Sequence, residues 1–352
     1  MKQILYFVFA FQLSGIVGCD LLSSDSADVS GEWLIPKDQI FDGGPGKDGI
    51  PALTNPQFAA ASATSYLKDN DLVILIKISN EIKAYPHPIL DWHEIINDGI
   101  GNDKFTITYC PLTGSGLAWN RVINGNETTF GVSGLLYNSN LLPYDRGSNS
   151  NWSQMKMLSV NGSLIGTQSE NFHVLETSWK TVKQLYPNAK VVTTATGHSR
   201  SYGTYPYGDY RTNHGLLIFP VSPDDNRLPR KERVLGVLVN SSAKAYRFKN
   251  NGNDIDLITD NLGGKNLVII NSKDRNIMTA YMSELEDDSL VVLTSVQNEL
   301  PIVMVDTDGN KYDLFGEITV GPKAGMKLKP VTSMIAYWFA WGAFYPNTSI
   351  GN

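Results

Sequence analysis

The chain has 352 residues, of which 42% are hydrophobic and 18% charged, and its formal net charge is −6. This composition favours a folded protein with a core large enough for two domains or one large one. Acidic and basic residues are interspersed without a basic tract, so we expect no nucleic-acid partner.

The amino-terminal segment has the order of a bacterial lipoprotein signal peptide. Lys2 precedes an apolar run that is too short for a comfortable membrane span, and Ile16-Val17-Gly18-Cys19 has the lipobox order. We therefore predict a signal peptide over residues 1–19, with Cys19 as the lipidated residue. An exported protein of the cell envelope would follow, held on the extracytoplasmic face of a membrane by its lipid anchor.

The remaining chain is expected to have four parts. Residues 20–49 predict a flexible tether, because their Ser/Asp-rich start and their glycine-rich end can bury little surface. Residues 50–190 and 235–352 predict two related copies of one β-rich unit. Residues 191–234, rich in Tyr, Gly and Pro, predict an ordered connection that packs across both copies. The predicted fold class is therefore α+β and β-rich, an internal duplication with short helices at the edges.

The duplication is predicted from matches that occur in constant order. Residues 91–110 align without a gap on residues 253–272, so that Cys110 faces Ser272. A second series, at one offset, pairs Gly162, Gly166, Trp179, Tyr186 and Pro187 with Gly321, Gly325, Trp338, Tyr345 and Pro346. Matched positions are those a shared scaffold needs, and residues present in one copy are candidates for function. The alternative is chance similarity between β-rich segments.

Local patterns predict the elements that lead to Cys110. Residues 71–85 predict two strands joined by a turn. Pro88 predicts the start of a short amphipathic helix that ends at Gly99. Residues 104–109 alternate in polarity and predict a strand that places Cys110 at its end.

A series of motifs resembles one known family. The motifs are Tyr85-Pro86, Trp92-His93-Glu94, Tyr109-Cys110-Pro111-Leu112, Ser133-Gly134-Leu135, Tyr144-Asp145-Arg146 and Trp152-Ser153-Gln154. In their order they resemble the bacterial and archaeal domain of unknown function 3179 family, from about residue 48 to 345. The resemblance implies no established reaction. Some relatives carry Cys-Pro-x-Cys, and Thr113 at that position argues against a dithiol or two-thiolate metal site here.

Cys110 is the main candidate for chemistry. With Cys19 lipidated it is the single thiol, so it is either a small buried hydrophobe or a reactive group. A thiol becomes a nucleophile when its neighbours favour the thiolate. His93 is a candidate base, with Glu94 or Asn97 orienting it, which would make these four residues the catalytic set of a cysteine-dependent enzyme. The alternative is a core histidine bonded to a carbonyl.

The segment between residues 135 and 158 has no counterpart in the second copy. It carries the candidate substrate-binding residues Asn138, Asp145, Arg146, Trp152 and Gln154, which we expect on a long ordered loop. Arg146 could hold a carboxylate or a phosphate. In the alternative interpretation, Asp145 and Arg146 form a salt bridge that braces the loop.

A second class of function stays open from the sequence. Cys110, His93 and His87 are a ligand set that copper or zinc accepts, with Met155 or Met157 as a possible fourth ligand. The chain would then be a lipoprotein that binds a soft metal or a small ligand. A third alternative is a structural envelope protein without a site.

Overall fold

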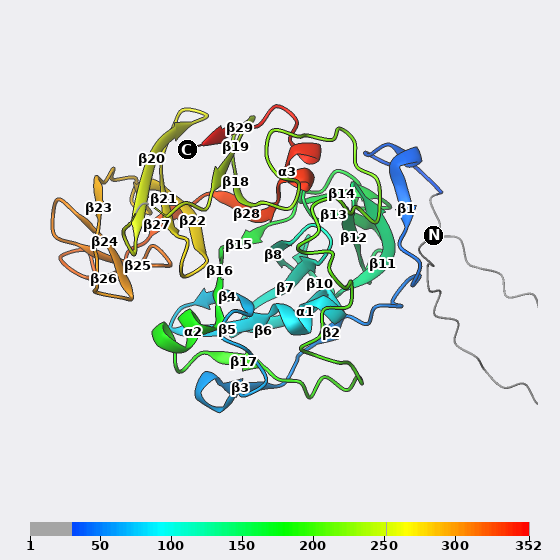
Figure 1. Ribbon diagram of the computed structural model, residues 1–352, viewed down its shortest axis with the longest axis horizontal. Helices are drawn as coiled ribbons and strands as arrows, with labels where there is room; N and C mark the ends of the chain where they lie inside the picture. The colour runs from blue at the N-terminus through cyan, green and yellow to red at the C-terminus, as the bar shows by residue number, and fades with distance from the viewer. Residues whose placement is uncertain (1–29, 251, 352) are drawn as a thin grey trace, which may run out of the picture.

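The computed structural model describes residues 30–250 and 252–351. These residues form a β-rich molecule of several sheets with short helices between them (Figure 1). The helices are η1 (Lys37–Gln39), η2 (Ala61–Ala63), α1 (His87–His93), α2 (Trp179–Leu185) and α3 (Trp338–Phe344). The β-rich prediction with short helices is confirmed.

The first half contains three five-stranded sheets and a small ribbon. The first sheet has the order β16 (Val174–Ser178), β4 (Leu72–Ile78), β5 (Glu81–Pro86), β17 (Lys190–Val192), β3 (Phe58–Ala60). The second has the order β15 (Asn171–Phe172), β8 (Ser115–Asn120), β7 (Asp103–Cys110), β6 (Ile95–Ile100), β2 (Leu53–Thr54). The third has the order β1 (Ile40–Asp42), β11 (Phe130–Tyr137), β12 (Asn140–Asp145), β13 (Asn151–Ser153), β14 (Leu158–Asn161), and the ribbon joins β9 (Val122–Ile123) and β10 (Asn126–Glu127).

The second half contains three four-stranded sheets. They have the orders β28 (Thr332–Tyr337), β18 (Arg233–Val239), β19 (Ser242–Arg247), β29 (Ser349–Gly351); then β20 (Asp256–Leu262), β21 (Lys265–Ser272), β22 (Ile277–Leu285), β27 (Leu328–Pro330); then β23 (Leu293–Ser295), β24 (Ile302–Asp306), β25 (Lys311–Asp313), β26 (Ile318–Val320).

These strand orders correspond between the halves. The order β16-β4-β5-β17 matches β28-β18-β19-β29, and the last strand of each set runs parallel to its neighbour. The order β15-β8-β7-β6 matches β27-β22-β21-β20. Helix α2 follows β16 as α3 follows β28. Between β19 and β20, however, the described residues form no helix, whereas α1 lies between β5 and β6.

Matched side chains make the same contacts in both halves. Lys83 and Tyr85 bind Asp98 at 2.9 and 2.7 Å. In the second half Lys244 and Tyr246 bind Asp260 at 2.6 and 2.7 Å. These matched residues serve the scaffold, because each trio ties a sheet of one half to the neighbouring sheet.

The two halves pack into each other. The backbone N–H of Tyr337 donates to the carbonyl of Thr113 at 2.7 Å, and that of Ser178 donates to the carbonyl of Arg275 at 3.3 Å. One apolar core joins the sheet of β11 to β14 with α3, and another joins α2 with the sheet of β23 to β26. Each half therefore completes its core with a helix of the other.

The connection between the halves has an irregular backbone. No helix or strand occurs between residues 193 and 232, all of which the structure describes. In Figure 1 this green segment passes over α1 on its way to the second half. Lys231 stabilises it by donating to the carbonyls of Tyr210, Asn213 and Leu216 at 2.5 to 2.7 Å. The connection is thus held by specific contacts despite its irregular path.

The flexible-tether prediction is wrong for residues 30–49. Strand β1 pairs with β11, and Ile35 is buried in the core that also contains Cys110. The glycine-rich run hid these contacts, because an edge strand of three residues leaves little periodicity in a sequence. Residues 20–29 and the signal peptide with Cys19 lie outside the described residues.

The helix prediction is wrong beyond His93. Helix α1 ends at Glu94, whose φ is 56° and ψ −32°, and residues 95–100 form β6. Strand β6 pairs with β7 along its whole length, and Gly99 lies within it rather than at a helix end. The β-branched Ile95 and Ile96 fit a pleated sheet, so ladder pairing outweighed the helical spacing.

The predicted loop at residues 145–154 belongs to a sheet. Strands β12 and β13 flank a tight turn, and β23 to β26 form the corresponding sheet in the second half. The matched Gly162 and Gly321 each lie where an added Cβ would come within 2.7 Å of the backbone of Ser150 or Asn310. The segment therefore lies in a sheet, as residues 302–313 do in the second half.

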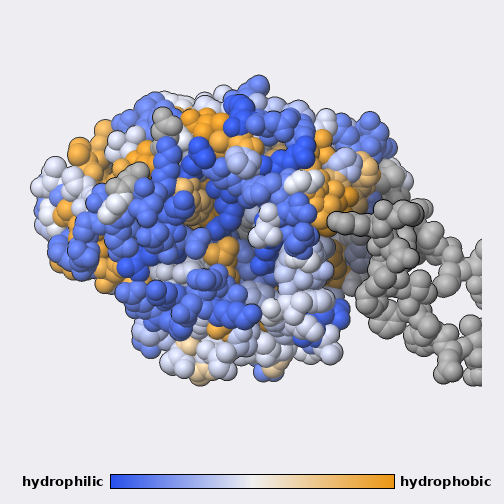
Figure 2. Space-filling model, in the orientation of Figure 1, coloured by the Kyte–Doolittle hydropathy of each residue, from blue (hydrophilic) through white to orange (hydrophobic). Residues whose placement is uncertain are grey.

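The surface facing the viewer in Figure 2 is mostly hydrophilic, with apolar residues in scattered patches. Among the described residues, no helix is long and apolar enough to cross a membrane.

Candidate functional site

Cys110 ends β7 and lies almost completely buried, with 1% of its surface exposed. Its thiol donates to the carbonyl of Ser139 at 3.5 Å. The backbone N–H of Thr113 donates to the Cys110 carbonyl at 3.3 Å. Burial and the charge of Glu94 raise the pKa of Cys110 to about 11, against an opposing effect of hydrogen bonding by Thr113 and by the backbone of Leu141. The thiol is therefore protonated at neutral pH, in a setting with donors ready for a thiolate.

Glu94 is the ionisable group that shares this site. Its carboxyl is 6% exposed, and burial raises its pKa to about 8, with a smaller rise from Asp91 and an opposing hydrogen bond from Tyr207. Its backbone has a positive φ, a strained conformation for a residue with a side chain. The Glu94 carbonyl accepts the N–H of Tyr109 at 2.7 Å, which ties Glu94 to the strand that carries Cys110.

A fully buried polar network lies on the sheet side of the thiol. Gln154 donates to Thr108 Oγ1 at 3.1 Å and accepts from the Ser115 hydroxyl at 2.7 Å. Asn140 donates to Gln154 Oε1 at 2.7 Å and to Thr113 Oγ1 at 2.9 Å. The hydroxyl oxygens of Thr113 and Ser115 are 2.8 Å apart and share a hydrogen bond. Gln154 is thus joined through the network to the residue that contacts the thiol.

The opposite side of the site is covered by residues 202–211, which we call the strap. Its contacts with α1 and with the turn after Cys110 are Tyr202 OH to His93 Nε2 at 2.6 Å, Trp92 Nε1 to the Thr204 carbonyl at 3.1 Å, Tyr205 OH to the Pro111 carbonyl at 3.1 Å, Tyr207 to Glu94, and the ion pair of Arg211 with Asp91. The guanidinium of Arg211 also lies 3.8 Å from the ring centroid of Tyr205. These contacts close the site to solvent.

A chain of buried charges continues from the strap into the second half. His87 Nε2 lies 3.1 Å from Glu176, which also pairs with Arg233 of β18. Burial lowers the pKa of His87 to about 3, so its ring is neutral at physiological pH. Asp91 Oδ1 is buried without a hydrogen-bond partner among the described residues. The site is therefore assembled from both halves and the connection.

His93 does not bond to the thiol. Its Nδ1 lies 2.7 Å from the Pro51 carbonyl and its Nε2 2.6 Å from Tyr202 OH, so both nitrogens have partners. Since a carbonyl can only accept, Nδ1 carries the proton and Nε2 accepts from the tyrosine. Burial lowers the pKa of His93 to about 4. The geometry matches the alternative of a core histidine bonded to a carbonyl.

Asn97 also lies apart from the thiol, on β6 rather than on a helix. Its amide donates to the carbonyls of Phe130 and Leu53 at 2.9 and 3.2 Å, and its oxygen accepts the N–H of Phe130 at 2.7 Å. These bonds connect three sheet segments, and they occupy the groups that would have oriented a base.

Four of the five candidate substrate-binding residues lie away from Cys110 in bracing contacts. Asp145 accepts the Ser148 N–H at 2.6 Å and Trp152 Nε1 at 3.1 Å, and Arg146 pairs with Asp48 at 2.7 Å. In the second half Asp306 accepts the N–H of Asn310 at 2.9 Å and the hydroxyl of Tyr312 at 2.7 Å. Each of the two aspartates thus binds one backbone N–H and one aromatic side chain.

Asn138 contacts the connection, because its side-chain oxygen accepts the N–H of Ser222 at 2.8 Å. The carbonyl of its neighbour Ser139 accepts the hydrogen bond of the Cys110 thiol. Of the predicted substrate-binding set, Gln154 alone reaches the network around Cys110.

The metal alternative has no ligand set in this structure. Across residues 30–250 and 252–351, no group of three or more His, Cys, Asp or Glu side chains is arranged to hold an ion. Nε2 of His87 contacts Glu176, and both ring nitrogens of His93 have partners other than Cys110.

Sequence reasoning missed Tyr207, Arg211, Asn140 and Ser115. The aromatic run in the connection signalled an ordered segment, and its absence from the second half could have assigned Tyr207 to the site. Asn140 and Ser115 stand in no recognisable pattern, since an asparagine after a turn and a strand serine are common. Their role follows from the tertiary structure.

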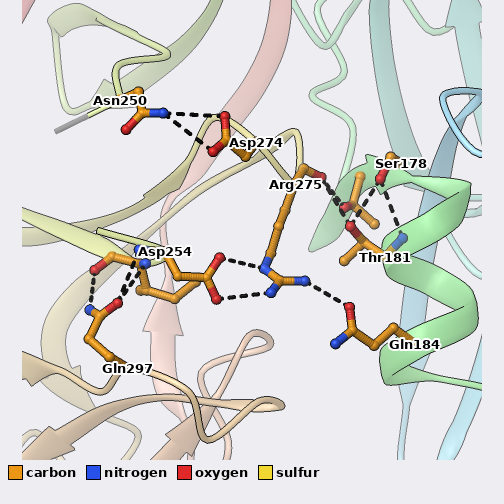
Figure 3. Close-up of polar contacts among 10 residues, drawn as sticks. Ser178, Thr181, Gln184, Asn250, Asp254, Asp274, Arg275 and Gln297 are labelled. Atoms are coloured by element: carbon orange, nitrogen blue, oxygen red, sulfur yellow. Dashed lines mark hydrogen bonds and ion pairs between the residues drawn. The ribbon is translucent and has the colours of Figure 1, made fainter. Parts of the chain in front are cut away.

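Strand β21 ends at Ser272 as β7 ends at Cys110, and Figure 3 shows the polar contacts of the turn that follows β21. Ser272 stands at the position of Cys110, with its hydroxyl buried and without a partner among the described residues. Arg275 binds Asp254 at 2.7 and 3.0 Å and Gln184 of α2 at 2.9 Å, as Figure 3 shows. This turn is closed by an ion pair, and the thiol has no counterpart at Ser272.

Comparison with known proteins agrees with the motifs around this site. A family model described as protein of unknown function (DUF3179) matches residues 47–348. The chain belongs to this family. The match covers both halves, the strap and every residue of the buried site. None of the curated proteins or solved structures compared with the chain matches it. The family description assigns no activity, so function must be argued from the site.

Proposed function

We propose that the protein is an exported, lipid-anchored envelope protein in which Cys110 acts as a nucleophile and Glu94 accepts its proton. The observation that carries the proposal is the buried Glu94 carboxyl, with a pKa raised to about 8, on a residue whose carbonyl is bonded at 2.7 Å to Tyr109, the neighbour of the buried Cys110. Strain at Glu94 supports a functional role, since backbone outliers cluster at such sites.

The chemistry is a proton transfer followed by nucleophilic attack. A carboxylate with a pKa near the working pH is both present in useful amounts and basic enough to take a proton. Hydrogen bonding by Thr113 and by the backbone of Leu141 lowers the pKa of Cys110 and so favours the ionised sulfur. The thiolate then forms a bond to an electrophilic substrate, and Glu94 holds the proton until it passes to the leaving group. The strap must open for this step, because Cys110 is 1% exposed.

We further propose that the two halves arose by internal duplication. Their matching strand orders and the repeated Lys–Tyr–Asp contacts support this. In this account the second half keeps the scaffold, supplies Arg233 and Tyr337 to the first, and carries Ser272 at the position aligned with Cys110. The lipid anchor on Cys19 and the envelope location rest on the lipobox.

The proposal is tested by the pH dependence of Cys110 alkylation in a Cys19→Ser background, where it is the single thiol. The iodoacetamide rate should show a step near pH 8, where Glu94 ionises. The conservative Glu94→Gln variant should lose that step, and the Cys110→Ser variant should take up no label. A profile of identical shape in the Glu94→Gln variant would contradict the role of Glu94. Absence of native-state labelling between pH 6 and 10 would favour the structural envelope alternative.

A further inference from the structure

We propose that a hollow between α3 and β29 is a binding site for a neutral oligosaccharide. In Figure 1, α3 leads through a red loop at the top of the view into β29. This loop and the turn before β19 line the hollow, whose volume is about 450 Å³. That volume lies within the range of about 300–1,000 Å³ that is usual for small-molecule sites. Cys110 is not among the residues that line the hollow, so the site needs none of the chemistry proposed for the thiol.

The polar side chains of the hollow are neutral and available to a ligand. Among the described residues that line it, none is Lys, Arg, His, Asp or Glu. Four of its polar side chains form no hydrogen bond within residues 30–250 and 252–351, and they are Ser241, Ser242, Asn347 and Ser349. Three hydroxyls and one amide can both donate to and accept from the hydroxyls of a sugar, but they offer no counter-ion to a charged ligand. This set therefore suits a neutral ligand with many hydroxyls.

The aromatic wall of the hollow is fixed in place. Tyr345 is partly exposed, its ring packs on that of Trp341 with centroids 4.3 Å apart, and its hydroxyl donates to the Met155 carbonyl at 2.5 Å. Trp341 is held in turn, because its Nε1 donates to Thr348 Oγ1 at 2.9 Å. Phe344, the last residue of α3, belongs to the same wall. Since the Tyr345 hydroxyl is already bonded, the wall offers ring surface, against which the C–H face of a sugar can pack.

The corresponding place in the first half carries an ion pair. Glu81 begins β5, Lys190 begins β17, and the two side chains bond at 2.9 Å. In the second half Ser242 begins β19 and Ser349 begins β29, and these two strands pair in the same parallel register as β5 and β17. Two short neutral side chains thus stand where the first half has two long charged ones. This difference leaves the hollow open and without charge.

A covering segment is also present in the first half. Strand β3 pairs with β17, and the buried Ala61 that follows it donates its N–H to the Ala189 carbonyl at 2.9 Å. In the second half no strand among the described residues pairs with the free edge of β29. Arg227 of the connection donates to the Thr348 carbonyl at 2.9 Å, but it does not line the hollow. The first half shows that the scaffold does not require this opening, so the hollow is a candidate for function.

The test is isothermal titration calorimetry in the Cys19→Ser background with three neutral trisaccharides, namely cellotriose, maltotriose and triacetylchitotriose. About four hydrogen bonds of ordinary net strength correspond to a Kd on the order of 1 mM for the sugar that fits. Asn347→Ala should raise that Kd roughly 10-fold, since one amide can supply two hydrogen bonds. Asn188→Ala is the matched control and should leave the Kd unchanged, because Asn188 is the exposed asparagine of the turn after α2 in the first half.

A second variant rebuilds the ion pair of the first half. Ser242→Glu combined with Ser349→Lys should close the hollow and raise the Kd at least about 10-fold, with Tm kept because neither serine is buried. No saturable binding of any of the three sugars at roughly 20 times the expected Kd would overturn the proposal. Equal binding by the parent and both hollow variants would place the sugar elsewhere and overturn it too. A synthetic peptide of residues 57–67, which binds without the sugars doing so, would replace it with strand docking at β29.

Discussion

The ion pair between Arg211 and Asp91 is expected to control how often the strap opens. Arg211 is 36% exposed in its side chain, whereas Asp91 is 4% exposed, and the second carboxylate oxygen of Asp91 already lacks a partner. Replacing Arg211 with methionine would keep the length and apolar contacts of the side chain. It would leave the Asp91 carboxylate without a cation.

The expected cost lies between two limits. Exposed pairs contribute about 0–1 kcal/mol, and loss of one partner of a buried pair costs about 3–5 kcal/mol, so a half-buried pair is expected to contribute about 2 kcal/mol to closure of the strap. This free energy corresponds to roughly a 30-fold increase in the open population. Because burial raises the pKa of Asp91, protonation should relieve the unpaired charge at low pH, and the increase should be smaller there.

The assay is native-state labelling of Cys110 with iodoacetamide in the Cys19→Ser background. We expect the Arg211→Met variant to react roughly 30-fold faster at pH 8. The Arg146→Met variant is the control, since Arg146 is as exposed as Arg211, at 35%, and pairs with Asp48 in a turn outside the strap. A labelling rate equal to that of the parent would refute a closing role for the pair. The free energy of global unfolding of the variant is measured in urea. If its decrease accounts for the whole increase in labelling rate, local opening of the strap is refuted.

Three further outcomes are expected. Because the pKa of Glu94 is raised to about 8 in the folded protein, the free energy of unfolding should fall as the pH rises from about 4.5 to about 8. In Glu94→Gln, the free energy of unfolding measured in urea should change less with pH across that range. Asp145→Ala and Asp306→Ala should each cost about 1–3 kcal/mol in the same measurement, since each strands a buried donor, and an effect on one alone would contradict their equivalence. Cys19→Ala should abolish fatty-acid labelling and membrane association, and retention of either would refute the lipid anchor.

The sequence predicted those parts of the fold that carry a regular pattern. The hairpin before α1 and the strand ending at Cys110 alternate or form apolar runs, and both are confirmed. The end of α1 was predicted wrongly because helical spacing persists by chance into β6, where pairing with β7 decides the structure. Asp145 was assigned to a substrate because its counterpart Asp306 lies at a different offset from the other matches.

The candidate site could be predicted in part. Cys110 and Gln154 were singled out because the second half lacks them, and Glu94 because it adjoins His93; in the structure Gln154 bonds to Ser115, which pairs with Cys110 across β7 and β8. His93 is adjacent to Glu94 in sequence, but helix α1 ends between them, at the positive φ of Glu94. The ring of His93 bonds to Pro51 and Tyr202 instead of the thiol. Contacts with the strap could not be predicted, since an irregular segment leaves no periodic trace in the sequence.

The protonation state of Glu94 tests the account most directly. It can be followed in protein labelled with ¹³C at glutamate side-chain carboxyls, with the resonance assigned by its absence from Glu94→Gln. The account predicts that this carboxyl titrates near pH 8 in the folded protein, as its burial beside the thiol requires. A midpoint near the ordinary glutamate value of about 4.3 would mean that Glu94 is a solvated anion at neutral pH and would contradict its role as the proton acceptor of Cys110.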